Sequence, residues 1–241
     1  AGHCMLIGTN VQGGEIAYNT CVQNKADDWG IVLKGGNIVC HHNIVTGPHS
    51  LYISGSRGCL VTNNSCYNGG TALPALKVAD NQDSTTPINN EIYNNVFLGI
   101  GASALCVSVD EGEEYHWDTY FDYNCYWTDN ATVATLGTIN CDLVDGLVDL
   151  LTAWSVTWTA ANATDTRIAF SANDSHSLVM NPALRNPAGG DFVPTNNLLL
   201  YSGKPDADGR ASYIGALHPK VGEPFDKNRW RYSGMTLGGH W

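Results

Sequence analysis

The stretch Val61-Thr62-Asn63-Asn64-Ser65-Cys66 is one copy of the short pattern that decides the fold of this chain. In each copy an apolar residue stands three positions before an Asn, and another stands two positions after it. The pattern occurs five times, within residues 16–21, 40–45, 61–66, 92–97 and 121–126. The repeated Asn residues are 24, 21, 31 and 29 positions apart, and the interval of 31 holds an insertion at 81–87. A sequence period of this length indicates a solenoid.

A short stretch with period-two alternation precedes each copy, at 5–8, 31–36, 51–56, 76–80 and 105–110. Alternation predicts strands, and it places one set of apolar side chains on a shared inward face: Ile31 and Leu33, Leu51 and Ile53, Leu76 and Val78, and Leu105 and Val107. A unit of two or three short strands cannot bury its own apolar side, whereas stacked units bury a continuous core. A sandwich or barrel would also give short strands, but without an Asn at a fixed place.

The repeated Asn has a physical role in such a stack. Equivalent residues of neighbouring coils lie about 4.8 Å apart, which is the spacing between strands. Asn tolerates the left-handed backbone conformation, so we expect it to make the corner between two strands. Its side-chain amide is then placed to hydrogen-bond the same amide of the next coil.

These five segments, each after a short alternating strand, resemble the repeats of right-handed parallel β-helices of the pectate-lyase-like superfamily. The segments 181–184, 191–192 and 213–216 resemble the closing part of many bacterial members. The resemblance covers about 3–130 for the coils and 180–217 for the tail. It implies an all-β, single-stranded parallel β-helix of about five coils. The superfamily contains lyases, hydrolases, epimerases, phage tailspikes and surface proteins, so the resemblance points to a fold before a function.

The chain divides into coils at 1–130 and a C-terminal cap and tail at 131–241, where the repeat is absent. Residues 142–154 have helical spacing with an acidic start, which predicts a short α-helix in the cap. Solenoid ends need a polar cap to prevent edge-to-edge growth. Because residues 4–7 already have the pattern of a coil strand, we expect preceding coils or another copy of the chain to cover the N-terminal edge.

The eight Cys residues fall mostly in the apolar slots of the pattern. Cys40 replaces the Ile or Val of other copies, while Cys21 and Cys66 share a slot two coils apart. We therefore expect mostly free, buried thiols, with a disulfide possible among Cys106, Cys125 and Cys141.

The histidines and the cysteines beside them could suggest a zinc site, but their spacing does not favour one. The pair His41-His42 and the dipeptide His3-Cys4 match no spacing of a structural zinc site. Successive strand residues point to opposite faces, so His41 and His42 are expected to be corner and surface histidines.

Composition excludes several classes of protein. The net charge is −11, with 23 acidic and 12 basic residues, which argues against nucleic acid as a partner because phosphate neutralisation needs a clustered basic surface. No apolar run approaches the roughly 20 residues of a membrane helix, so no membrane partner is expected. With 43% apolar residues the chain has ample material for a core.

Acidic residues concentrate in one interval. No Lys or Arg occurs between Lys77 and Arg167, whereas the interval holds 14 acidic residues, seven of them within 110–129. Stacking places Asp80 and Asp110 at the end of the same strand in adjacent coils. Oxygen-rich clusters of this kind suit Ca²⁺, and we expect Asp80, Asp110 and Glu111 to be its ligands.

The resemblance to polysaccharide lyases of this fold adds a catalytic hypothesis. Such enzymes use Ca²⁺ to neutralise a uronate carboxylate, with Lys or Arg as the base. Lys77 or Lys34, which point outward from the same sheet, would be the base here, with Arg57 at the next turn. Neighbouring carboxylates oppose a lowered lysine pKa unless Ca²⁺ masks them. The acidic stretch could equally be a solvated face.

A hydrolase would need two or three carboxylates around a glycosidic bond, and Asp27-Asp28 before Trp29 is a candidate pair that could equally be a turn. Aromatic side chains could bind sugar rings, and Trp29, Tyr52 and Trp117 are the candidates for substrate contact. The other aromatic residues of the acidic stretch line a groove or pack the last coil under the cap: Tyr115, Tyr120, Tyr123, Tyr126 and Trp127.

Together these features predict an extracellular or cell-surface β-helix domain that binds an acidic polysaccharide, with cleavage of that polysaccharide as an added hypothesis. The alternative is a non-catalytic surface or fibre module that assembles end to end through its uncapped N-terminal coil, as a homo-oligomer or beneath preceding coils.

Overall fold

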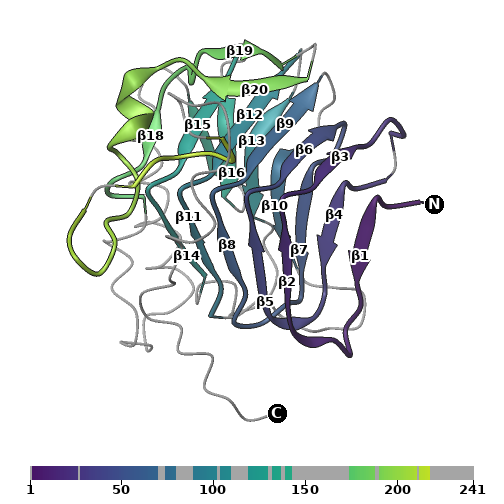
Figure 1. The fold of residues 1–241 in the computed structure, drawn as a ribbon. Helices are drawn as coiled ribbons and strands as arrows, with labels where there is room; N and C mark the ends of the chain where they lie inside the picture. Colours follow the sequence, from purple (N-terminus) through teal and green to yellow (C-terminus); the bar gives the residue numbers. More distant parts are fainter. Residues whose placement is uncertain are drawn as a thin grey trace.

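The computed structural model describes residues 2–26, 28–69, 74–79, 89–101, 104–109, 119–129, 132–136, 139–142, 174–187, 190–210 and 212–217. Within these ranges the chain winds through three sheets whose strands stack in sequence order (Figure 1). Each coil gives its first strand to sheet A, its second to sheet B and its third to sheet C. The predicted parallel β-helix is therefore the fold of this chain.

The strand bounds follow the repeat. Sheet A contains β1 (Met5–Ile7), β4 (Ile31–Leu33), β7 (Leu51–Ser54), β10 (Pro74–Ala79), β13 (Leu105–Val109), β16 (Thr132–Leu136) and the antiparallel β17 (Ile139–Asp142). Sheet B contains β2 (Gln12–Ala17), β5 (Gly36–His41), β8 (Leu60–Thr62), β11 (Glu91–Tyr93) and β14 (Tyr120–Asp122). Sheet C contains β3 (Thr20–Val22), β6 (Ile44–Gly47), β9 (Ser65–Gly69), β12 (Val96–Ile100), β15 (Cys125–Thr128) and β18 (Leu178–Val179).

The core consists of inward columns that run through the stack. Sheet B contributes Ile16, Cys40, Val61, Ile92 and Phe121 in register, and sheet C contributes Cys21, Val45, Cys66, Phe97 and Tyr126. All ten residues are buried in one cluster with the inward column of sheet A. The expected Cys slots are thus confirmed, and the seven cysteines whose side chains are described are all unbonded thiols.

The corner between sheets B and C differs from the expectation in one detail. The residue in the left-handed conformation is the one before the repeated Asn, with φ between 51° and 59°: Tyr18, His42, Asn63, Asn94 and Tyr123. The prediction that the repeated Asn itself adopts this conformation is wrong. The Asn is needed for its amide instead, and stacking between Tyr18 and His42, whose ring centroids lie 5.3 Å apart, accompanies the strained corner.

The predicted amide ladder is present and continuous. Oδ1 of Asn43 accepts hydrogen bonds from both the backbone N–H and the side-chain amide of Asn19, each at 3.0 Å. The same double contact joins Asn43 to Asn64, Asn64 to Asn95 and Asn95 to Asn124, over 2.9–3.1 Å. Each side-chain amide of the inner coils also donates to main-chain carbonyls at the end of sheet B.

The last coil is closed by a segment that follows no repeat in the sequence. Ser177 takes the next ladder position, where its hydroxyl accepts from the backbone N–H of Asn124 at 3.0 Å. Asp174 accepts from the hydroxyls of Ser177 and of the buried Tyr126, at 2.7 and 2.8 Å. This short segment therefore satisfies the polar groups that the fifth coil leaves at the end of the stack.

The tail then runs back across the corner between sheets B and C, seen in green above β12 and β15 (Figure 1). It forms the hairpin β19 (Leu184–Asn186) and β20 (Asp191–Pro194) and the 3-10 turn η4 (Asn197–Leu200). Gly215 approaches the stack closely, since a Cβ there would lie 3.1 Å from the Val96 side chain. Of the helix expected at 142–154, Asp142 ends strand β17 and residues 143–154 lie outside the described residues; the short helix that the described part does show is only this 3-10 turn.

The ladder predicts a specific stability order for substitutions of Asn64. Asn64→Ala removes the acceptor of two Asn43 donors and leaves buried polar groups without partners, so the free energy of unfolding should fall by about 2–4 kcal/mol. Asn64→Ser should cost less, because a hydroxyl serves as the ladder acceptor at Ser177. Urea unfolding followed by circular dichroism measures both, with the exposed Asn24→Ala as control. Equal losses for Asn64→Ala and Asn24→Ala would contradict a stabilising ladder.

Candidate functional site

The outer face of sheet A brings together three of the residues predicted from the sequence. Tyr52 of β7 and Lys77 of β10 are direct neighbours across the strands. The ring of Trp29, which precedes β4, lies 4.8 Å from the ring of Tyr52 and 4.6 Å from that of His49. Two candidate sugar-binding aromatic residues and one candidate base thus share one surface, although the sequence assigned them separately.

The other two candidate bases lie apart from this group. Lys34 follows β4, two coils before the strand that carries Lys77. Arg57 is exposed at the turn between β7 and β8, where its carbonyl accepts from the N–H of Asn37 at 2.8 Å. The structure therefore does not join Lys34 and Arg57 to the group around Tyr52.

The predicted Ca²⁺ ligands Asp80, Asp110 and Glu111, together with Trp117, lie outside the described residues. Within the part of the chain that the structure describes, no three His, Cys, Asp or Glu side chains converge as metal ligands would. Of the candidate hydrolase pair, only Asp28 is described, and one oxygen of its carboxylate accepts from the N–H of Gly2 at 2.7 Å. That hydrogen bond is the largest cause of the lowered pKa of Asp28.

The outer face of sheet B carries a second cluster, which the sequence did not predict. Lys204 reaches back from the tail and places its ammonium group 4.0 Å from the ring centre of Tyr93 and 5.8 Å from that of Tyr120. The same ammonium group lies 3.4 Å from the Glu91 carboxylate. Burial, together with the charge of Glu91, raises the pKa of Tyr93 to about 12, so this phenol stays neutral.

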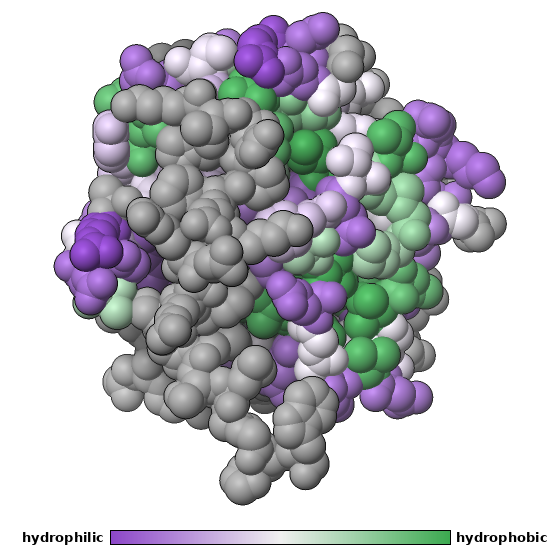
Figure 2. Space-filling view, viewed as in Figure 1, coloured by the Kyte–Doolittle hydropathy of each residue, from purple (hydrophilic) through white to green (hydrophobic). Residues whose placement is uncertain are grey.

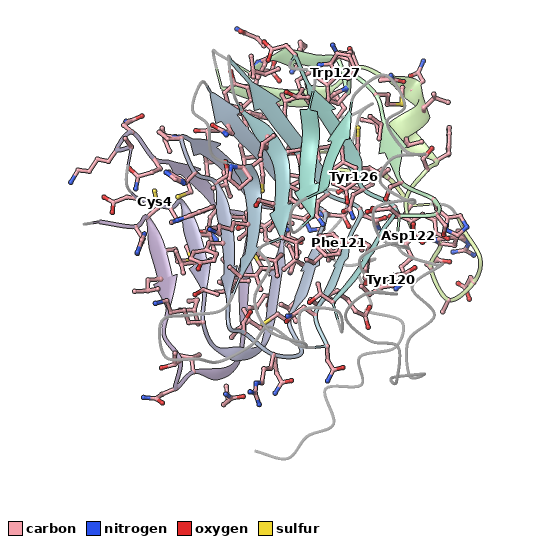
Figure 3. All side chains as sticks on the ribbon, turned by 180° about the vertical axis from the view of Figure 1, so that it is seen from behind. Cys4, Tyr120, Phe121, Asp122, Tyr126 and Trp127 are labelled. Atoms are coloured by element: carbon pink, nitrogen blue, oxygen red, sulfur yellow. The ribbon has the colours of Figure 1, made fainter. Side chains whose placement is uncertain are left out.

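Next to this cluster, Asp122 holds His176 in a fixed orientation. One oxygen of Asp122 accepts from the backbone N–H groups of His176 and Tyr123, and the other accepts from Tyr120 Oη and His176 Nδ1, all within 2.7–2.9 Å. The His176 ring stacks on Tyr123 at 4.6 Å with an interplanar angle of 3°. Figure 3 shows Tyr120 and Asp122 beside the cap, while Phe121 and Tyr126 point into the stack.

These four hydrogen bonds occupy both carboxylate oxygens of Asp122, whose side chain is only 1% exposed. Since that carboxylate can only accept, Nδ1 of His176 carries the proton and Nε2 is the nitrogen left for solvent. The sequence did not predict the contact between Asp122 and His176. Ser177 takes the place of the repeated Asn after the fifth coil, so the repeat pattern does not reveal that residues 174–179 continue the stack.

A third polar group joins the first two coils to the tail. Glu15 contacts His41 Nε2 at 2.7 Å, His41 Nδ1 lies 2.7 Å from His42 Nδ1, and His42 Nε2 lies 2.9 Å from Tyr213 Oη. The expectation of surface histidines is wrong, because both residues are buried and the tail residue Tyr213 contacts His42. With Glu15 as the final acceptor and both imidazoles neutral, each group donates to the next: Tyr213 to His42, His42 to His41, and His41 to Glu15.

Burial controls the protonation of both histidines. It lowers the pKa of His42 to about 3, with His41 acting in the same direction. It also lowers the pKa of His41, although the hydrogen bond that His41 donates to Glu15 opposes that shift. The chain of hydrogen bonds therefore forms between neutral rings at neutral pH.

Comparisons with protein-family models, with curated proteins and with solved structures find no match to this chain. Among the described residues, no helix is long and apolar enough to span a bilayer. The function therefore has to be argued from the surfaces described above.

The buried histidines predict a loss of stability in mild acid. Below their ordinary pKa of 6.5 the unfolded chain binds protons that folded His42 does not take up until about pH 3, so stability is full above pH 6.5 and falls as the pH drops. Between pH 6.5 and 4.5 His42 alone should account for a loss on the order of 2 kcal/mol.

Thermal melts at several pH values test this assignment with His42→Asn, because Asn tolerates the left-handed conformation of that corner. The variant should be less stable at pH 7.5, where it lacks the contact with Tyr213, but its stability should fall less steeply with acid. Parallel curves for the two proteins would rule out His42 as a source of the acid sensitivity.

Proposed function

We propose that this chain is an extracellular or cell-surface β-helix module of the pectate-lyase-like type that binds an acidic polysaccharide on the outer face of sheet A. The observation that carries the proposal is the position of Lys77 beside Tyr52, with Trp29 packed against the same ring. Aromatic faces stack on sugar rings, and a lysine beside them supplies the charge that a uronate carboxylate requires.

The regular strands make this face suitable for a polymer. Each coil advances the surface by about 4.8 Å, so a linear chain can contact several coils in succession. Lys34 adds a second cation on the same sheet, two coils before Lys77. Ca²⁺ held by Asp80, Asp110 and Glu111 would offset the negative charge of the protein near the polymer, and cleavage would then be a β-elimination with Lys77 as the base.

Binding to polygalacturonate, measured by retardation in an affinity gel, tests the proposal. Lys77→Met and Trp29→Ala should each weaken binding about tenfold, a loss of roughly 1.4 kcal/mol, and added salt should weaken binding by the unaltered protein. Arg210→Ala, which removes an exposed charge in the tail, should bind normally. Retention of full affinity by both sheet A variants would exclude this face as the binding surface.

Cleavage is tested separately on the same polymer. The unsaturated product of β-elimination absorbs short-wavelength ultraviolet light, and its formation should require Ca²⁺ and fail in Lys77→Ala. Binding without any product, with or without Ca²⁺, would leave a carbohydrate-binding module and overturn the lyase activity.

A second candidate function is end-to-end assembly, and the first coil favours it. Three of its apolar side chains are exposed: Leu6 by 51%, Val11 by 41% and Val22 by 58%. Figure 2 shows apolar surface gathered over the N-terminal strands, on the side of the molecule where β1 lies in Figure 1. In this role the chain would be a structural module that stacks on another coil.

Light scattering after gel filtration decides whether this surface assembles. Assembly predicts particles larger than one chain that dissociate in the double variant Leu6→Glu and Val22→Glu. A matched change at the tail, Leu198→Glu, should leave the size unchanged, because Leu198 is similarly exposed but distant from the first coil in the sequence. Monomers at all concentrations would exclude assembly of this chain with itself.

A further inference from the structure

The first coil contains two cysteines, Cys4 and Cys21, of which one is exposed to solvent and the other is buried. Cys4 is the one exposed cysteine among the seven whose side chains are described, whereas Cys21 is buried in the core column of sheet C. Figure 3 shows Cys4 at the end of the stack opposite Asp122. The two residues belong to the same turn of the helix, at the start of sheet A and within sheet C.

The register of sheet A directs the side chain at position 4 toward Cys21. Met5 pairs with Ile31, so Cys4 lies beside Gly30 of the next coil, and its N–H donates to Trp29 O at 3.3 Å. A Cβ built on Gly30 would lie 3.5 Å from the sulfur of Cys21, which shows that this position faces inward toward that thiol.

The contacts of the sulfur atoms agree with the register. Cys4 Sγ lies 3.5 Å from the carbonyl oxygen of Val22, the residue after Cys21. Burial raises the pKa of Cys21 to about 12, and the neighbouring Cys4 thiol acts in the same direction. The buried thiols of Cys106 and Cys125 also donate to main-chain carbonyls, those of Trp127 and Met180.

We propose that Cys4 and Cys21 form a redox-active thiol pair whose disulfide closes residues 4–21 into a ring at the first coil. The oxidant is a low-molecular-weight disulfide such as oxidised glutathione. The Cys4 thiolate attacks it, which forms a mixed disulfide and releases one glutathione thiolate. The Cys21 thiol then loses its proton and attacks the Cys4 sulfur, which releases the second glutathione; two protein thiols are oxidised and one disulfide is reduced.

The order of these steps follows from exposure. Solvent reaches Cys4, while Cys21 is protonated and enclosed, so the external disulfide meets Cys4 first and Cys21 acts as the resolving thiol. The position also gives the bond a structural effect. The described first coil has a neighbouring coil on one side only, and cross-linking its two outer strands limits local opening there.

Peptide mapping tests the proposal directly, because no Lys or Arg occurs before Lys25. The tryptic peptide 1–25 therefore contains Cys4 and Cys21 and no other cysteine. After exposure to oxidised glutathione, unfolding and alkylation, this peptide should carry no alkyl group and weigh about 2 Da less than its reduced form. Cys40, the single cysteine of the peptide 35–57, should remain fully alkylated in the same digest.

Variants separate the two steps. Cys4→Ser should abolish the mass change, and Cys21→Ala should retain glutathione on Cys4 because no thiol resolves the mixed disulfide. Alkylation of both cysteines in the unaltered protein, a persistent glutathione adduct, or a link between two chains through Cys4 would each overturn the proposal. Hydrogen exchange of the β1 and β3 amides should slow at least about tenfold on oxidation, and unchanged exchange would overturn the stapling effect.

Discussion

The corner between sheets B and C is the place where each coil must reverse direction without losing its backbone hydrogen bonds. A buried N–H without a partner costs about 1–3 kcal/mol, and this corner recurs in every coil. The amides of Asn43, Asn64, Asn95 and Asn124 meet that need by accepting from the coil before and donating to the carbonyls around them, and Asn19 begins the series as a donor. Sheets B and C keep the same register from coil to coil as this corner repeats.

The fixed corner also explains which positions can carry different side chains from coil to coil. Inward positions must be apolar to fill the shared core, and ladder positions must supply a side-chain hydrogen-bond acceptor. The outer faces carry no such constraint, so adjacent coils present different groups: Tyr52 beside Lys77 on sheet A, and Tyr93 beside Asp122 on sheet B. The tail adds its own residues to sheet B, since Lys204 and Tyr213 come from far along the chain.

The sequence was sufficient for most of what repeats. The apolar slots, the inward columns and the contacts between equivalent Asn residues all follow from a spacing that is visible in the chain. It also predicted Trp29, Tyr52 and Lys77 individually, but their meeting depends on the register between coils. Local pattern could not settle which of two adjacent corner residues takes the left-handed conformation, since Asn63-Asn64 and Asn94-Asn95 permit both.

The contacts made by the tail lay beyond sequence reasoning for a different reason. His42 is buried and hydrogen-bonded to Tyr213, which is 171 residues away, and no periodicity links the two residues. The pairing of Asp122 with His176 likewise depends on Ser177 entering the ladder with a hydroxyl in place of an amide. Such contacts are set by long-range packing, which a repeat analysis does not represent.

The ladder has a direction, and the two ends of the stack therefore differ in kind. At every step the earlier coil donates and the later coil accepts, so the last acceptor is the hydroxyl of Ser177, and the outermost amide oxygen is that of Asn19. Two first coils meeting face to face would set oxygen against oxygen at this corner. The ladder can be extended at Asn19 only by a surface that offers N–H donors, such as a coil that ends in a donating asparagine. Coils can therefore be added to the stack in one orientation only.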